Sequence, residues 1–360
     1  MVSINDSRLF SGAFQGCILG TAVGDAIGLP REGLSARRAA RLFGSAPLDH
    51  RLLIGRGMVS DDTEHTCMVA QALLASKGNP DAFARSLAWK LRWWLLGLPA
   101  GVGSATARSI LKLWLGFPPH RSGVWSAGNG PAMRSAILGV YAGDDDDLLL
   151  RLVHASTVIT HCDPAAEHGA LAVALAARYG AMRGSEGVRP AEFLAHAEKY
   201  LKDAPLMHLL SRANDHLQQG DDAAEYAVAL GLRHGVSGYI NHTVPVALYC
   251  WLRRPDDFRS AVEAAVLLGG DTDTTGAIVG ALMGATLGVE AIPAEWLDGL
   301  AEWPRTTQWM RTLGEHLSEA KTHAGMEGQL PLFWPDVLLR NVFFLGVVLA
   351  HVLRRCLPPY

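Results

Sequence analysis

Cysteine is scarce in this sequence and has no regular spacing. The 360 residues contain five cysteines, an odd number, and no two of them are spaced as Cys-X-X-Cys. A disulfide framework or a cysteine zinc site therefore has no support, and the pattern is typical of a protein from a reducing compartment. The first ten residues lack the apolar core of a signal peptide, so we expect a cytoplasmic location.

An excess of charge of one sign and several catalytic motifs are also lacking. Charged residues make up 19% of the chain and the formal net charge is -3, which gives no basic field for general nucleic-acid binding. A local site for a phosphorylated small molecule is compatible with this composition, since such a site needs few residues. No Gly-X-Ser-X-Gly, His-Glu-X-X-His or Walker motif occurs, so catalysis by a nucleophilic Ser or Cys has no sequence support.

Strand-like alternation of Val, Ile and Thr is hard to find, whereas Ala, Leu and Arg fill long helix-like stretches. With 49% hydrophobic residues the chain can build a substantial core, and no Gly/Ser- or Pro-rich linker divides it. We predict an all-α fold, a compact single-domain orthogonal helical bundle. Its helices are expected near residues 10–28, 62–77, 81–97, 104–115, 131–142, 145–155, 164–180, 190–218, 222–234, 242–252, 257–268 and 275–287.

The C-terminal region differs from the rest in composition. We assign residues 1–325 to the all-α domain and residues 326–360 to an apolar helical tail. The uninterrupted apolar run of the tail, residues 342–350, is shorter than the roughly 20 residues that a bilayer span requires, so we predict no transmembrane span. We expect a docked helix, with a dimer contact or a membrane-surface anchor as the alternatives. The sequence leaves the oligomeric state open.

Two short acidic segments, far apart in the sequence, each lead into an apolar helix-like run. Their side chains all offer oxygen atoms: Ser60, Asp61, Asp62, Asp271, Asp273 and Thr274. Carboxylates packed against apolar helix starts are costly unless a positive charge lies between them, and oxygen ligands indicate a hard divalent cation or a pair of them. Either segment alone is explained as well by helix N-capping. Two segments with doubled acids favour a metal site, for one divalent cation or a pair of them.

Other segments carry candidate substrate-binding residues. Glu32 follows a proline in a predicted loop, from which it can reach a substrate or a metal-bound water. A flexible loop before a helix start offers backbone N–H groups that suit a phosphate or pyrophosphate, and Gly103 belongs to a weaker loop of the same kind. His161 either fills space or contacts the substrate, and Asp25 is expected to be a buried carboxylate held by hydrogen-bond donors. The flexible loop contains Ser126, Ala127, Gly128, Asn129 and Gly130.

Taken together, these segments resemble the ADP-ribosylglycohydrolase family, which includes the dinitrogenase reductase-activating glycohydrolase and the ADP-ribosyl-arginine and ADP-ribosyl-serine hydrolases. The resemblance runs from about residue 12 to residue 290, and the acidic motif after Gly269 and Gly270 is its most specific part. A departure from the family pattern is Pro131, where a small residue is usual. The matching pieces are residues 16–20, 24–28, 60–63, 128–130, 133–134, 160–161, 163–164 and 269–274.

The resemblance implies an all-α fold with a central dinuclear metal cleft for two divalent cations, Mg²⁺ or Mn²⁺. It implies that the two acidic segments named above bind the metals, that Glu32 caps them, that residues 126–130 hold the pyrophosphate, and that His161 lines the ribose pocket. The implied activity is metal-dependent cleavage of the glycosidic bond between ADP-ribose and a protein side chain, arginine first and serine second. The partner is then an ADP-ribosylated protein or ADP-ribose itself. Catalysis would fall to Glu32, Asp62 and Asp273, and the sequence does not say whether Asp62 or Glu32 moves the proton.

Two other functions remain open at the level of sequence. One is a catalytically silent protein that binds ADP-ribose or neutralises a toxin. The other is a dinuclear metal phosphohydrolase, since carboxylate-rich metal pairs also cleave phosphoesters. Only His65 lies next to an acidic motif, and this shortage of histidine argues against the phosphohydrolase.

Overall fold

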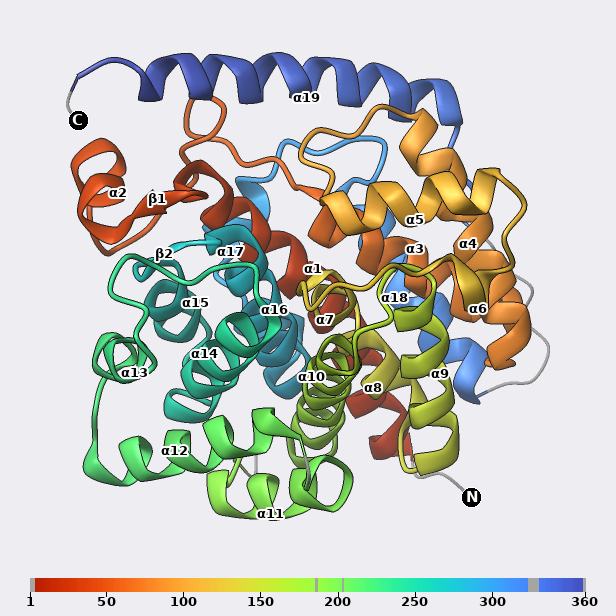
Figure 1. The fold of residues 1–360 in the computed structure, drawn as a ribbon, viewed down its shortest axis with the longest axis horizontal. Coiled ribbons are helices and arrows are strands. Elements are labelled where there is room, and N and C mark those ends of the chain that lie inside the picture. The colour runs from red at the N-terminus through yellow and green to blue at the C-terminus, as the bar shows by residue number, and fades with distance from the viewer. Residues whose placement is uncertain (1–3, 185–186, 203, 323–329, 359–360) are drawn as a thin grey trace.

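The computed structural model describes residues 4–184, 187–202, 204–322 and 330–358, and these residues form a predominantly helical protein (Figure 1). The predicted all-α fold is confirmed. Two short strands, β1 (Leu34–Ser35) and β2 (Gly269–Gly270), pair antiparallel, with Leu34 opposite Gly270. The helices are α1 (Ile4–Gly28), η1 (Leu29–Arg31), α2 (Ala36–Phe43), α3 (Asp61–Ser76), α4 (Pro80–Leu96), α5 (Ser104–Trp114), α6 (Pro119–Ser122), α7 (Gly130–Met133), α8 (Ala136–Ala142), α9 (Asp146–Val158), α10 (Pro164–Arg183), α11 (Pro190–Leu201), α12 (Pro205–Gln219), α13 (Ala223–Ala229), α14 (Ile240–Arg253), α15 (Phe258–Val266), α16 (Thr272–Leu287), η3 (Val289–Ala291), α17 (Ala294–Asp298), α18 (Thr307–Thr322) and α19 (Trp334–Arg355).

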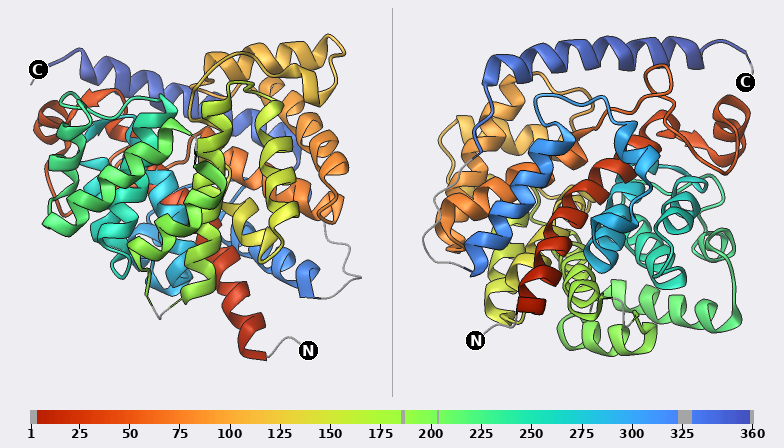
Figure 2. Two further views of the ribbon diagram at one scale, coloured as in Figure 1. Left: turned by 60° about the horizontal axis from the view of Figure 1, so that its bottom comes forward. Right: turned by 180° about the vertical axis from the view of Figure 1, so that it is seen from behind.

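Helices α1 and α16 lie side by side through the centre of the molecule (Figures 1 and 2). Their backbones approach closely because glycines face each other along the crossing. A Cβ atom on Gly20 would lie 2.1 Å from the carbonyl oxygen of Gly280, and one on Gly24 would lie 2.0 Å from that of Gly276. At the end of the pair, the Thr272 hydroxyl donates a hydrogen bond to the Gly28 carbonyl at 2.8 Å. The sequence therefore fixes the start of α16 against the end of α1.

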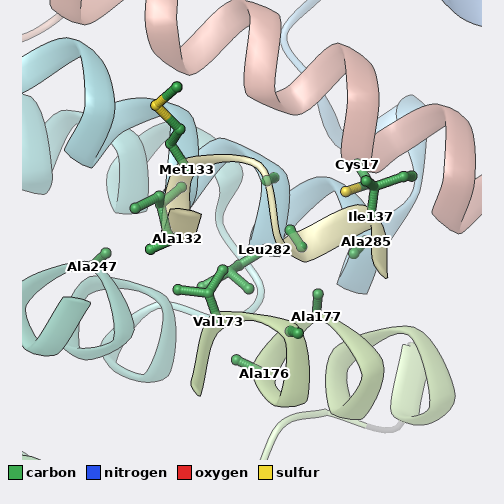
Figure 3. Close-up of a cluster of buried hydrophobic side chains, with 14 of the residues drawn as sticks. Cys17, Ala132, Met133, Ile137, Val173, Ala176, Ala177, Ala247, Leu282 and Ala285 are labelled. Atoms are coloured by element: carbon green, nitrogen blue, oxygen red, sulfur yellow. The ribbon is translucent and has the colours of Figure 1, made fainter. Parts of the chain in front are cut away.

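Small apolar side chains fill the space around this central pair. Figure 3 shows Cys17 of α1 and Leu282 of α16 packed with residues of α8, α10 and α14. Helices α8 and α10 also cross closely, because Gly139 leaves no side chain between itself and the Ala174 carbonyl. Burial of such a continuous apolar core is the main contribution to the stability of an all-helical fold.

Most of the predicted helices are observed, and the differences have local causes. The helix predicted over residues 190–218 is two helices, α11 and α12, because α12 begins at Pro205, which has no N–H to continue a preceding helix. The helix predicted over 131–142 is likewise interrupted after Met133, where Arg134 leaves helical geometry. Helices α2, α6, α17 and α18 were not predicted. The proposed domain boundary after residue 325 lies outside the described residues.

The tail forms the long helix α19, which runs along one edge of the molecule (Figure 1). Arg340 and Asn341 of this helix are buried: Arg340 binds Glu302 through Nη2 at 2.6 Å, and Asn341 donates to the Gly97 carbonyl at 2.8 Å. Two of the described helices, 12–31 and α19, are long and apolar enough to cross a membrane, and they are 89% and 28% buried. Helix α19 extends well beyond its uninterrupted apolar run, which is why it reaches this length.

Candidate active site

The two acidic segments meet at the starts of α3 and α16. Ser60 caps α3, its side chain accepting a hydrogen bond from the Asp62 N–H at 3.3 Å. Asp271 precedes α16 without making such a side-chain cap. The Thr274 hydroxyl donates to Asp62 Oδ2 at 3.3 Å across 212 residues of sequence. Helix capping thus accounts for Ser60 but leaves the carboxylates unexplained.

Asp25, near the end of α1, holds the first acidic segment in place. Its carboxylate accepts hydrogen bonds from the Ser60 N–H at 2.8 Å and from the Thr63 hydroxyl at 2.6 Å. Burial raises the pKa of Asp25 to about 7, although these donors favour its charged form. The prediction that Asp25 is a buried carboxylate held by hydrogen-bond donors is confirmed.

The cluster is electrostatically unfavourable as it stands. Burial, with added repulsion from neighbouring carboxylates, raises the pKa of Asp61, Asp62 and Asp273 well above the usual range. Burial also raises the pKa of Glu32, as does the negative charge of Asp271. A bound cation would reverse these effects, because it favours the ionised form of each ligand.

The donor set fits a hard divalent cation. Two buried carboxylate oxygens, Asp62 Oδ1 and Asp273 Oδ1, have no hydrogen-bond partner among the described residues. Unsatisfied charged oxygens are costly in a protein interior, so an ion is the natural partner for them. As they are placed, no three acidic, His or Cys side chains in the described ranges converge closely enough to hold an ion. Several oxygens are instead turned towards protein donors, as Asp62 Oδ2 is towards Ser60 and Thr274.

Most of the predicted site residues line one cavity of about 270 Å³. Ser60, Asp62 and Ala127 do not line it; Asp62 lies beneath, with 1% of its surface exposed. Ala105, Thr106 and Gly238 also line the cavity and were not predicted from the sequence. Gly238 ends a glycine-containing stretch that offered a signal, whereas Thr106 lies within α5 and offered none. The predicted residues that line the cavity are Glu32, Asp61, Gly103, Ser126, Gly128, Asn129, Gly130, His161, Asp271, Asp273 and Thr274.

The loop predicted to hold a pyrophosphate is tied directly to the second acidic segment. Asn129 donates from Nδ2 to Asp271 Oδ2 at 2.6 Å and to the Thr243 hydroxyl at 2.9 Å. The Asn129 N–H donates to the Gly238 carbonyl at 3.0 Å, which holds the loop against the segment before α14. Pro131 occupies the first turn of α7, where its missing N–H costs no hydrogen bond.

His161 packs directly on this loop. Cβ atoms on Gly128 and Gly130 would lie 3.2 Å and 3.1 Å from its ring atoms Nε2 and Cε1, so both glycines are needed for the contact. His161 Nδ1 is 2.9 Å from the Thr160 hydroxyl, which also accepts from buried Arg134 at 2.7 Å. Burial and the Arg134 charge lower the pKa of His161 to about 3. The imidazole is therefore neutral at physiological pH.

The fold and the cavity define an all-α protein with a polar cavity lined by carboxylates and by a glycine-containing loop. A model of the ADP-ribosylglycohydrolase family matches residues 6–325. The chain therefore belongs to the ADP-ribosylglycohydrolase family, as the resemblance implied, and it is an enzyme that hydrolyses glycosidic ADP-ribose linkages. Members of this family generally depend on divalent metals.

Relatives match over most of their length. An uncharacterised protein of Archaeoglobus fulgidus is 35% identical over 294 residues, which are 80% of this chain and 92% of that protein. The ADP-ribosyl-[dinitrogen reductase] glycohydrolase of Rhodospirillum rubrum is 29% identical over 79% of this chain and 89% of its own. Among solved structures, an ADP-ribosylglycohydrolase-related protein complex superposes with a TM-score of 0.63 at 29% identity, covering 87% of this chain and 99% of that one.

Proposed function

We propose that this protein removes ADP-ribose from modified arginine side chains of proteins, using two Mg²⁺ or Mn²⁺ ions, in the cytoplasm. The observation that carries the proposal is the pair of buried, partnerless oxygens Asp62 Oδ1 and Asp273 Oδ1 on two helix starts that meet. The metal-holding residues would be Ser60, Asp61, Asp62, Asp271, Asp273 and Thr274. The Rhodospirillum rubrum relative, named for a modified protein, supports a protein substrate.

The cavity suggests how an ADP-ribosyl group would be held. Residues 126–130 would bind the pyrophosphate through backbone N–H groups, as the start of a helix does for other anions. His161 is neutral and packs against the same loop, so it can donate or accept a hydrogen bond at a ribose hydroxyl without adding charge. Asn129 would fix the distance between the pyrophosphate and the metals, because it binds Asp271 directly.

The residues at the cleft suit cleavage of an anomeric bond. Bound cations would orient the ribose hydroxyls and make water a better nucleophile near neutral pH. Nearby carboxylates stabilise the positive charge that develops on the sugar in an oxocarbenium-like transition state. Glu32 lines the cavity and has a raised pKa, which suits a group that exchanges a proton with water or the leaving group. Asp62 is buried below the cavity, so we assign the proton transfer to Glu32.

Charge favours arginine over serine as the acceptor. Five carboxylates belong to the site, Glu32, Asp61, Asp62, Asp271 and Asp273, and two divalent cations would leave one negative charge over. A residual negative charge favours a cationic guanidinium leaving group over a neutral serine hydroxyl. Serine remains the second candidate, and the two linkages can be compared directly.

Release of free ADP-ribose tests the proposal. Peptides carrying ADP-ribosyl-arginine or ADP-ribosyl-serine are incubated with the protein and Mg²⁺, Mn²⁺ or EDTA. We expect metal-dependent release, faster from arginine and abolished by Asp273→Asn. Asp257→Asn is the matched control, because Asp257 also precedes a helix but is remote from the site.

Three outcomes would contradict the proposal. Tight ADP-ribose binding without release, with metal bound, would indicate a silent binding or immunity protein. Release of AMP in place of ADP-ribose would indicate a phosphohydrolase. Equal loss of activity in Asp273→Asn and Asp257→Asn would remove the assignment of the acidic segments.

A further inference from the structure

Helix α19 lies beyond the region that the family model matches, yet it binds backbone groups beside the candidate site. Arg355 donates from Nη1 to the Glu32 carbonyl at 2.8 Å and from Nη2 to the Pro30 carbonyl at 2.9 Å. At the other side of the cleft, Arg340 donates from Nη2 to the Val59 carbonyl at 2.6 Å, immediately before Ser60. One helix therefore contacts both the Glu32 loop and the first acidic segment.

The Glu32 loop is held by several contacts besides Arg355, among them the Arg31 guanidinium, which donates to the carbonyls of Phe43 and Gly44. The Gly33 N–H donates to the Gly270 carbonyl at 2.7 Å, at the start of the β1–β2 pair. Gly33 has a φ of 72°. Because glycine restricts the backbone little, the residues before it need contacts of their own to be held in one position. The planar guanidinium of Arg355 fixes two carbonyls of those residues at once.

We propose that Arg355 is a positioning residue, which holds the Glu32 loop over the cleft and makes the tail part of the working enzyme. This inference rests on the proposed function, in which Glu32 acts at the metals. Arg355 does not line the cavity, and it acts on Glu32 in two ways: through the loop, and through its positive charge, which lowers the pKa of that carboxyl. Arg355→Lys keeps the charge and so separates the two effects.

Kinetics and hydrogen exchange on Arg355→Ala test the inference, with Arg354→Ala as the matched control. Arg354 is exposed and donates only to the carbonyls of Leu357 and Pro358 at the chain end, among the described contacts. We expect Arg355→Ala to lower kcat/KM about tenfold, as for misplacement of a catalytic group, and to speed amide exchange in residues 31–35. Arg355→Lys should restore little of the lost kcat/KM or amide protection, because an ammonium group cannot donate to two carbonyls at once as the planar guanidinium does.

The outcomes separate this inference from the proposed function. Wild-type kinetics and exchange in Arg355→Ala would overturn it, as would equal losses in both alanine variants. Amide exchange needs no turnover, so it tests the inference even if the wild type releases no ADP-ribose. Faster exchange across the whole domain would indicate general unfolding and would also count against a local role.

The outer face of α19 is a separate feature, because it is exposed and apolar. Between Asp336 and Arg354 every exposed residue of the helix is apolar. The helix cannot leave the domain cheaply, since buried Arg340 pairs with buried Glu302. The exposed large side chains are Leu339, Val342, Phe343, Leu345, Leu349, Val352 and Leu353.

Arginines surround one end of this face. Apart from the buried Arg31 and Arg340, residues 31–58 and 334–358 contain seven arginines and three acidic residues, in a chain whose net charge is -3. The two segments touch, since Arg38 donates to the Arg355 carbonyl and the rings of Phe43 and His351 stack at 6.2 Å. At the other end, Trp334 packs against Trp93 with ring centroids 6.0 Å apart.

The geometry points to a surface that lies on an anionic lipid bilayer, with α19 parallel to the membrane plane. An apolar helix face flanked by arginines and tryptophans has the composition of interfacial helices. Excess positive charge attracts anionic headgroups and repels a second copy of the same face. A span across the bilayer would break the buried pair of Arg340 and Glu302, so the helix lies on the membrane.

Vesicle flotation of the full chain tests this surface. We expect the protein to float with phosphatidylcholine vesicles that contain phosphatidylglycerol, and not with phosphatidylcholine alone, and to dissociate as NaCl is raised. The double variant Val342→Glu/Leu349→Glu should stay in solution. Met182→Glu is the control, because Met182 is equally exposed on α10, away from this face. Failure to float, or a dimer by light scattering that the double variant splits, would overturn the proposal.

Discussion

Because α1 and α16 cross closely, we expect Gly→Ala substitutions at two positions of α1 to change the free energy of unfolding in opposite directions. Gly20 faces the backbone of Gly280, and a Cβ atom there would lie 2.1 Å from its carbonyl oxygen. Gly12 lies in the same helix, but among the residues that the structure describes a Cβ atom there would meet nothing within 4 Å. We expect Gly20→Ala to destabilise the protein and Gly12→Ala to stabilise it.

The size of each change in the free energy of unfolding depends on two opposing effects, the higher helix propensity of alanine and the steric cost of its methyl group. Alanine gains roughly 1 kcal/mol over glycine in a helix, and this term applies to both variants. At Gly20 the new methyl group must push the helices apart by about 1 Å, against backbone atoms that cannot rotate away, so the cost should reach the upper end of the roughly 1–3 kcal/mol typical of overpacking. The net expectation is a loss of about 2 kcal/mol for Gly20→Ala and a gain of about 1 kcal/mol or less for Gly12→Ala.

Urea unfolding in EDTA, followed by circular dichroism, measures both changes without a contribution from metal binding. Because Gly24 and Gly28 make equally close contacts nearer the site, Gly20→Ala should also weaken Mn²⁺ binding, whereas Gly12→Ala should not. Equal effects of the two substitutions on the free energy of unfolding would refute the argument, since it depends entirely on what each Cβ atom meets.

Three further predictions concern the site. Asp25→Asn should weaken Mn²⁺ binding in calorimetry by about tenfold, the lower end for loss of a group that supports metal ligands, because Asn loses the negative charge and places an NH2 group where Oδ1 now accepts from the Ser60 N–H; unchanged affinity would contradict this. Gly130→Ala should raise KM about tenfold by displacing His161, with Mn²⁺ affinity unchanged as the check on its locality. In the folded state the pKa values of Asp61, Asp62 and Asp273 are raised above the unfolded value of 3.8. Folding of the metal-free protein therefore takes up protons. Its stability should fall as pH rises from about 4 through the raised pKa values. The contribution of His161 is common to both media, so the difference between the free energies of unfolding in Mn²⁺ and in EDTA isolates the carboxylates. This difference should grow as pH rises, because the metal ligands bind deprotonated; parallel pH curves in the two media would contradict the linkage.

Local sequence signals predicted the helices well where periodicity, caps and prolines agreed. Helices α3, α4 and α5 begin within a residue of their predicted starts, because each follows a capping residue or a glycine turn. The predictions failed where one side chain overrides the pattern, as Pro205 does between α11 and α12. The amphipathic helix α18 was missed because it follows the last recognisable motif and lies in a stretch rich in polar residues.

At the site, too, local features could be predicted from the sequence and long-range contacts could not. Oxygen-rich segments next to glycines could be recognised in the sequence, since their chemistry is local to a few residues. The contacts that join them could not, because they depend on which carbonyl lies opposite which donor in the folded chain. The bond from Asn129 to Asp271 spans 142 residues, and the bonds from Arg355 to the Glu32 loop span more than 300. No periodicity or motif carries that information.

The close helix crossing explains why an unfavourable cluster of carboxylates persists at the centre of the molecule. Each ligand lies at the start of a helix, where the unpaired backbone N–H groups partly offset negative charge. Asp25 accepts from N–H groups at the start of α3, and Thr272 ties the start of α16 to the end of α1. The scaffold therefore brings the helix starts that carry the carboxylates together through glycine contacts far from the cleft, so that binding of an ion requires only the side chains to turn towards it. Preorganisation of this kind lowers the cost of ordering the site when the metal binds. Substitutions in the α1–α16 contact should therefore change metal affinity even though they touch no ligand.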